Sequence, residues 1–225
     1  MSGLLLALAL GGFLVVSAAR PLLAELQALP ARALAESLQG GQPLSLTEAR
    51  EMAETSERAA ALAASADHWQ RAAIARLKIA EMHGIWSNQG LRETESALAM
   101  ERESLTAAPG NSFGWLWLSQ VEARVHGISP LSTHAWRLSV EAEPFAPDIE
   151  AMRLRVGLLQ WSRLDETDRA VLAETVRKQA ARQVWGLVEP AIQADGTKII
   201  RQILLNDPPK LAAFNQGVAS YLPNK

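Results

Sequence analysis

Cysteine is absent from this chain of 225 residues. Its absence excludes disulfides, thiol chemistry and cysteine-ligated metal sites together. It leaves the compartment open, because an exported helical protein needs no disulfide. Tyrosine occurs once and phenylalanine four times, against seven tryptophans. Strand-favouring residues are sparse while Ala, Leu, Glu, Arg and Gln are abundant, so we predict an all-α protein.

The chain also lacks a strong charge and the usual motifs of catalysis. Its net charge is −2 and no segment is basic enough to indicate nucleic-acid binding. None of the four histidines forms an i, i+4 pair, which argues against a helical metal site. Asp195-Gly196-Thr197-Lys198 lacks the preceding glycine and strand of a phosphate loop. Acidic residues such as Glu101 and Glu103 alternate with arginine, which is typical of a solvated helix face. We therefore predict no catalytic residue, no metal and no cofactor.

An uncharged run opens the chain, from Gly3 to Ala19, and ends at Arg20 and Pro21. Its length is at the lower limit for a membrane span and exceeds a typical signal-peptide core. No Lys or Arg precedes the run, so the charged start of a signal peptide is missing. We predict that residues 1–20 form a retained transmembrane anchor. Two alternatives stay open: a signal segment cleaved after the Val16-Ser17-Ala18 site, and a buried helix of a soluble protein.

Residues 21–44 read as a partly amphipathic helix with a break at Pro30, followed by a linker over Gln39–Pro43. We place a domain boundary in this linker. Ser45 or Thr47 can cap the helix that comes next. We expect residues 45–165 to form helical repeats and residues 166–225 to form a helical cap that covers the last repeat.

The most regular stretch runs from Ala97 to Pro144 and alternates helical patterns with tight turns. Pro109 and Pro144 mark turns that are 35 residues apart. Between them lie small and apolar residues at helical spacing: Trp115, Leu118, Ser119, Ala135 and Leu138.

This spacing resembles the tetratricopeptide repeat (TPR), a helix pair of about 34 residues. Trp115 and Leu118 match its first helix, and Ser119 stands where the family prefers glycine. Glu122 departs from it, because a tyrosine is expected there. The resemblance implies a TPR-like α-solenoid of about three helix pairs: 66–83 with 91–107, 112–127 with 131–143, and 147–161 with 167–188. The N-terminal apolar helix precedes this solenoid.

The resemblance also implies where a partner would bind. TPR-like solenoids present a concave face, formed chiefly by the first helix of each pair, to a segment of another protein. Trp115 and Leu118 are expected to pack between helices, so the binding surface should lie on the opposite side, near Gln120 and Arg124. Arg153 and Arg155 on the next first helix are further candidates, although solvation alone would also explain them.

The overall layout is similar to small membrane-anchored proteins of proteobacterial envelopes, some of which accompany polysaccharide polymerisation and export. We therefore predict a non-enzymatic adaptor or scaffold, anchored in the bacterial inner membrane, that binds envelope or membrane proteins. This likeness favours a periplasmic body, whereas Arg20 and Arg32 after the span favour a cytoplasmic one. Two alternatives stay open: a glycan-binding accessory protein that uses exposed tryptophans, and an enzyme without a recognisable motif.

Overall fold

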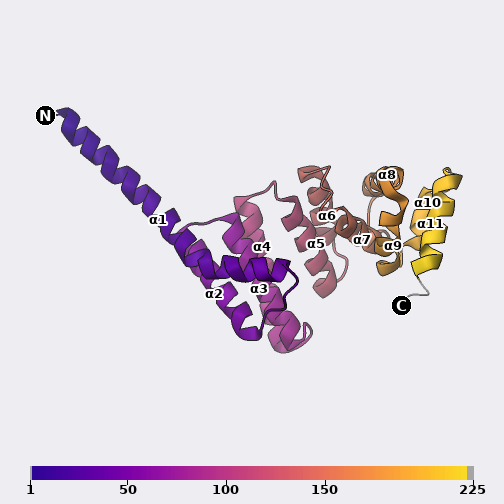
Figure 1. The fold of residues 1–225 in the computed structure, drawn as a ribbon, viewed down its shortest axis with the longest axis horizontal. Coiled ribbons are helices and arrows are strands. Elements are labelled where there is room, and N and C mark those ends of the chain that lie inside the picture. Colours follow the sequence, from indigo (N-terminus) through magenta and orange to yellow (C-terminus); the bar gives the residue numbers. More distant parts are fainter. Residues whose placement is uncertain (1, 222–225) are drawn as a thin grey trace. The chain divides into compact units, whose positions relative to one another are not determined.

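The structure is a computed structural model that describes the backbone of residues 2–221 and the side chains of residues 18–221. The described residues contain helices and no strand, which confirms the all-α prediction (Figure 1). The elements are α1 (Ser2–Gln39), α2 (Leu46–Leu62), α3 (Ala66–His83), α4 (Asn88–Ala107), α5 (Ser112–His126), α6 (Pro130–Ala142), α7 (Glu150–Gln160), α8 (Glu166–Gln183), the 3-10 helix η1 (Val184–Leu187), α9 (Val188–Gln193), α10 (Thr197–Ile203) and α11 (Pro208–Tyr221).

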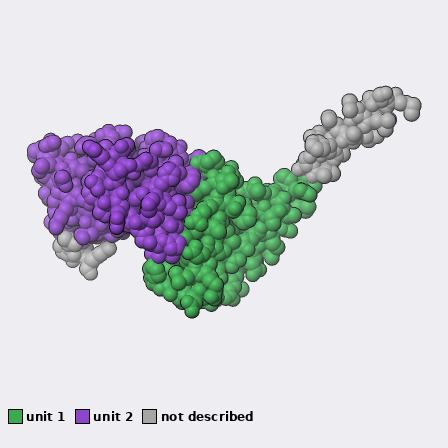
Figure 2. Space-filling view, turned by 180° about the vertical axis from the view of Figure 1, so that it is seen from behind, with its two compact units in different colours: residues 1–109 green, residues 110–225 purple. Residues whose placement is uncertain are grey.

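The helices divide into two compact units, residues 1–109 and residues 110–225 (Figure 2). The division falls between Pro109 and Gly110, inside the segment 45–165 that the sequence predicts as one block of repeats. We call these parts unit 1 and unit 2.

In unit 1, each helix packs against the next along the chain, from α1 through α4. Alanine supplies much of the buried surface, which allows the helix backbones to approach closely. The start of α2 is fixed by a capping box: the backbone N–H of Glu48 donates to Ser45 Oγ at 3.3 Å, and the backbone N–H of Ser45 donates to Glu48 Oε2 at 2.7 Å. The buried alanines of this unit include Ala31, Ala49, Ala53, Ala59, Ala60, Ala72, Ala73, Ala75, Ala80 and Ala97.

Helix α1 continues through Pro21 and Pro30, so the expected break at Pro30 is wrong. Both prolines are exposed, whereas Ala24, Ala28 and Ala31 are buried against the rest of unit 1. The missing N–H groups therefore fall away from the packed face, and tertiary contacts hold the helix together.

Among the described residues, no helix is both long enough and apolar enough to cross a bilayer. The predicted anchor is the run from Gly3 to Ala19. Its residues up to Ser17 lie outside the part of the chain whose side chains the structure describes.

Unit 2 is built on large side chains, which form one core that extends from α5 to α11. Trp136 is its largest fully buried residue, and the indole Nε1 donates to the Arg153 carbonyl at 3.0 Å. The ring lies directly on the backbone of Gly157, where an added Cβ would come within 2.9 Å of Trp136 Cζ2. Helix α7 can therefore pack against α6 only because residue 157 has no side chain.

The predicted helix pairs hold for α3 with α4 and for α5 with α6, which are packed extensively within each pair. The third pair differs, because α7 has more contact with α9 than with α8. Helix α8 ends at Gln183 and passes into η1, while Pro190 lies inside α9. The helix expected over residues 167–188 thus ends at Gln183, where the chain tightens into a 3-10 turn.

Candidate functional site

The residues that the sequence assigns to the repeat lie mostly in the packed interior. Leu118, Ser119 and Ala135 are buried, and Trp115 and Leu138 are half-buried. The two prolines lie in exposed turns, Pro109 after α4 and Pro144 after α6.

Arg153, a predicted partner-binding residue, is only 3% exposed. Its guanidinium donates to the Ser139 carbonyl at 2.7 Å, to the Glu143 carbonyl at 3.1 Å and to Ser139 Oγ at 3.3 Å. Burial lowers the pKa of the Arg153 side chain, and nearby Glu143 and Glu150 oppose that shift. The alternative of a solvated side chain is therefore wrong for Arg153, which instead fixes the C-terminal end of α6 to α7.

The other three candidates, Gln120, Arg124 and Arg155, line one groove of about 560 Å³. We call it the α5–α7 groove, since those helices form most of its walls and Gln193 of α9 completes it. Arg155 also donates to Gln193 Oε1 at 3.3 Å. The remaining lining residues are Ala123, Ile128, Val156, Leu159 and Gln160.

Gln160, which lines this groove, is fully buried and its amide is fixed by a hydrogen-bond chain. Its Nε2 donates to Ser119 Oγ at 2.8 Å, and that hydroxyl donates to the Ser132 carbonyl at 2.7 Å. The amide oxygen Oε1 has no hydrogen-bond partner among the described residues and is closed off from the surface. A buried acceptor without a partner is costly, so Gln160 is a strained element of the packed interior beneath the groove.

The α5–α7 groove combines cationic, amide and apolar side chains. Arg124 and Arg155 provide cationic donors for carboxylates, and Gln120 and Gln193 can pair with backbone amides. Leu159, 49% exposed, offers an apolar contact in the same groove. Together these groups match an extended segment that carries both an acidic and an apolar side chain.

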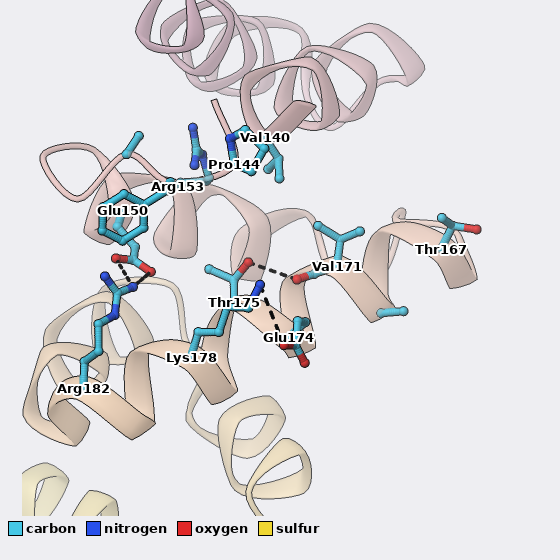
Figure 3. A pocket seen from close by; sticks show the side chains of 13 residues that line it. Val140, Pro144, Glu150, Arg153, Thr167, Val171, Glu174, Thr175, Lys178 and Arg182 are labelled. Atoms are coloured by element: carbon cyan, nitrogen blue, oxygen red, sulfur yellow. Dashed lines mark hydrogen bonds and ion pairs between the residues drawn. The ribbon is translucent and has the colours of Figure 1, made fainter. Parts of the chain in front are cut away.

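A second hollow, of about 650 Å³, lies between the end of α6, the turn before α7 and one side of α8 (Figure 3). Phe145 is 68% exposed here, and the Arg182 guanidinium lies 5.3 Å from the centre of its ring. Arg182 is also paired with Glu150, through a contact of 2.6 Å to Oε2 (Figure 3). Lys178 and Glu174 form a second ion pair in this hollow, and the guanidinium of Arg153 is held by Ser139 and Glu143, so each cation of the lining already has a partner.

A third hollow, of about 390 Å³, adjoins the α5–α7 groove, because Arg155 and Gln193 line both. Its distinctive side chain is Trp185, which is 50% exposed and lies near Pro190 and Met152. An exposed indole beside polar groups is a surface on which a sugar ring can stack.

Two titratable residues are buried in unit 1. Glu101 is fully buried, so the prediction of a solvated face is wrong for it, although Glu103 is exposed as expected. Burial raises the pKa of the Glu101 carboxyl to about 7, against the opposing effect of the Gln70 amide, which donates to Oε1 at 3.4 Å. Glu101 shares a helix face with buried Ala97 and Leu98, and this register is the sequence signal that could have revealed its burial.

His68 is the second of these residues, and only 1% of it is exposed. Burial is the main cause that lowers its pKa, and Arg71 acts in the same direction. Its Nε2 lies 3.4 Å from Glu25 Oε1 of α1. Neither His68 nor Glu101 lines the three hollows. Within the described residues, no group of His, Asp or Glu side chains could hold a metal ion.

Compared with protein-family models, with curated proteins and with solved structures, the chain gives no match.

Proposed function

We propose that the protein is a non-enzymatic adaptor, built as a TPR-like α-solenoid, which binds a segment of another protein in the α5–α7 groove. The observation that carries the proposal is the convergence of Gln120, Arg124 and Arg155 on one groove. The preferred segment is extended and places an acidic side chain near the two arginines.

The proposed setting is the bacterial inner membrane, with the N-terminal apolar run as anchor and the body in the periplasm. The charge-free sequence from Gly3 to Ala19 supports the anchor. The partners would then be envelope or membrane proteins, including those that assemble surface polysaccharide.

The test of the adaptor proposal is a comparison of variants. The full-length chain, in detergent, is immobilised and exposed to envelope extract. Wild type is compared with Arg124→Glu/Arg155→Glu, which reverses the charge of the groove, and with Arg163→Glu, which makes the same change at an exposed arginine outside the groove. We expect one set of proteins to be retained by wild type and by Arg163→Glu, and at least tenfold less of it by the groove variant.

Two outcomes reject the adaptor proposal. One is retention of no protein by a chain whose circular dichroism shows intact helices. The other is retention that is equal for all three proteins, since binding would then not involve the groove.

A glycan-binding accessory protein is the second candidate, and the third hollow with Trp185 is the observation that favours it. Added envelope polysaccharide is then expected to quench tryptophan fluorescence, and Trp185→Ala should remove most of the change. Unchanged emission of the wild-type protein at saturating glycan rejects this candidate. An enzyme is the weakest candidate: Glu101, whose pKa burial raises to about 7, lies away from the three hollows, and Arg153, which lines the second hollow, donates its guanidinium hydrogens to Ser139 and Glu143.

A further inference from the structure

The part of α1 whose side chains are described has one apolar face that is packed and one that is exposed. Ala24, Ala28 and Ala31 are buried, whereas Leu22, Leu26 and Leu29 are 62%, 55% and 51% exposed. Each leucine precedes one of these alanines by two residues. Because two residues differ by about 200° around an α-helix, the leucines point away from the alanine face. Leu23, at the edge of the exposed face, is 52% exposed as well.

The exposed leucines follow the spacing of a coiled-coil seam. Leu22, Leu26 and Leu29 are separated by four and three residues, and Ala19 and Ala33 continue the same alternation on either side. No charged residue occupies these positions, so an identical seam from another chain would meet apolar side chains throughout. Soluble proteins seldom leave such a contiguous row uncovered.

Two of the charged side chains next to the exposed leucines are paired within the protein. Glu25 accepts a hydrogen bond from Arg32 at 2.9 Å within the same helix, and it also contacts His68. A helix that lies on a membrane surface is typically rich in Lys and Arg on its polar face, opposite the apolar one. The only cations on the described part of α1 are Arg20 and Arg32, and Arg32 is paired. This pattern favours a protein partner over a lipid surface.

The area of the seam indicates how far it must extend. A buried leucine contributes on the order of 100 Å² here, so Leu22, Leu23, Leu26 and Leu29 supply about half of the roughly 800 Å² per partner of a stable interface. Helix α1 begins at Ser2, and the same alternation continues backwards in the sequence through Val15, Gly12, Leu8 and Leu5. The sequence N-terminal to the described leucines therefore keeps the spacing that a longer seam requires.

We infer that the protein self-associates through α1, with the Leu22, Leu26 and Leu29 seam of one copy packed in parallel against the same seam of a second copy. This pairing is independent of the α5–α7 groove. It would present two grooves on one anchored assembly, so a partner with two binding segments would be held more tightly than by one copy.

Cysteine cross-linking tests the seam directly, because the chain has no native cysteine to interfere. Single variants Leu22→Cys, Leu26→Cys and Leu29→Cys are placed in the full-length chain and reconstituted in phosphatidylethanolamine–phosphatidylglycerol vesicles. Gln27→Cys, one residue from Leu26 and exposed on another side of α1, is the matched control. After mild oxidation we expect disulfide-linked dimers from the three seam variants and at least fivefold less from the control.

A second set of variants separates the possible causes of a result. Leu26→Glu/Leu29→Glu is expected to abolish the dimer formed by Leu22→Cys while hydrogen exchange in α2 stays unchanged, since neither leucine contacts the packed face. Arg124→Glu/Arg155→Glu should leave the dimer intact, so loss of adaptor binding and loss of pairing remain distinguishable.

Several outcomes overturn the inference: equal cross-linking at seam and control positions, no dimer at any position, or a dimer that survives Leu26→Glu/Leu29→Glu. A fluorophore on Leu26→Cys that is quenched by brominated lipid, without any dimer, would assign the seam to the bilayer instead.

Discussion

Unit 1 and unit 2 achieve helix packing in different ways. Unit 1 uses long helices that meet through alanine. Unit 2 uses shorter helices with large apolar residues around Trp136, and its irregular packing encloses three hollows. Alanine interfaces bring backbones close together, whereas large side chains and short helices leave grooves at the helix ends. Under the proposed function, the surface for recognition belongs to unit 2.

The largest expected effect comes from Trp136→Ala, which tests whether the two units are stabilised separately. The change removes the centre of the unit 2 core and its hydrogen bond to Arg153, and it should destabilise unit 2 by about 4 kcal/mol. Hydrogen exchange measured by mass spectrometry should show faster exchange in α5–α9 and unchanged exchange in α2–α4. Equal acceleration in both units would mean that they unfold together, and the contrast drawn above would fail.

Glu101→Gln tests the buried carboxyl of unit 1. The pKa of Glu101 is raised from 4.5 to about 7, so the folded state favours the protonated acid. The stability that this provides is complete below pH 4.5 and is lost as the pH rises through about 7. Relative to Glu101→Gln, wild-type unit 1 should therefore lose about 3 kcal/mol between pH 4.5 and pH 8.

Urea titrations of both proteins across this pH range, read by hydrogen exchange in α4, measure that difference. Glu103→Gln, at an exposed position two residues away, is the control and should show no such trend. His68 has the opposite sign, because its pKa is lowered and the stability it provides is lost as the pH falls below 6.5. If the free energies of unfolding of wild type and Glu101→Gln differ by the same amount at every pH, the buried-acid interpretation is contradicted.

The smallest expected effects come from two buried serines, one in each unit. Ser119→Ala breaks the chain from Gln160 to the Ser132 carbonyl and leaves buried polar groups unpaired, so we expect a loss of about 2 kcal/mol in unit 2. Ser104→Ala removes one hydrogen bond from α4 to the Ala66 carbonyl and should cost unit 1 about 1 kcal/mol. Chemical denaturation of the two variants measures their free energies of unfolding. A larger loss for Ser104→Ala than for Ser119→Ala would contradict the expected order.

The local features of the fold could be read from the sequence. The Ser45 cap, the turn before Asn111 and the bounds of α3 follow from short-range capping and spacing rules. The continuation of α1 through Pro30 could not, because it depends on alanine contacts with helices further along the chain.

The candidate site shows the same limit. Gln120 and Arg124 could be placed on the side of α5 away from the repeat positions by helical spacing alone, and they line the groove that Arg155 shares. The burial of Arg153 could not be predicted, because its acceptors belong to Ser139 and Glu143 on another helix. The burial of Gln160 could not be predicted for a similar reason: its side-chain amide donates to Ser119, which is 41 residues away in sequence.

The contact between Trp136 and Gly157 also restricts which sequences this protein can adopt in evolution. Even a methyl group at position 157 would press on the indole ring, and a smaller ring at position 136 would leave a void over the glycine. A change at either position alone should lower the stability of unit 2, so the two residues should be inherited together. Among descendants of this chain, a side chain at 157 is expected only where the tryptophan has already been replaced by a smaller residue.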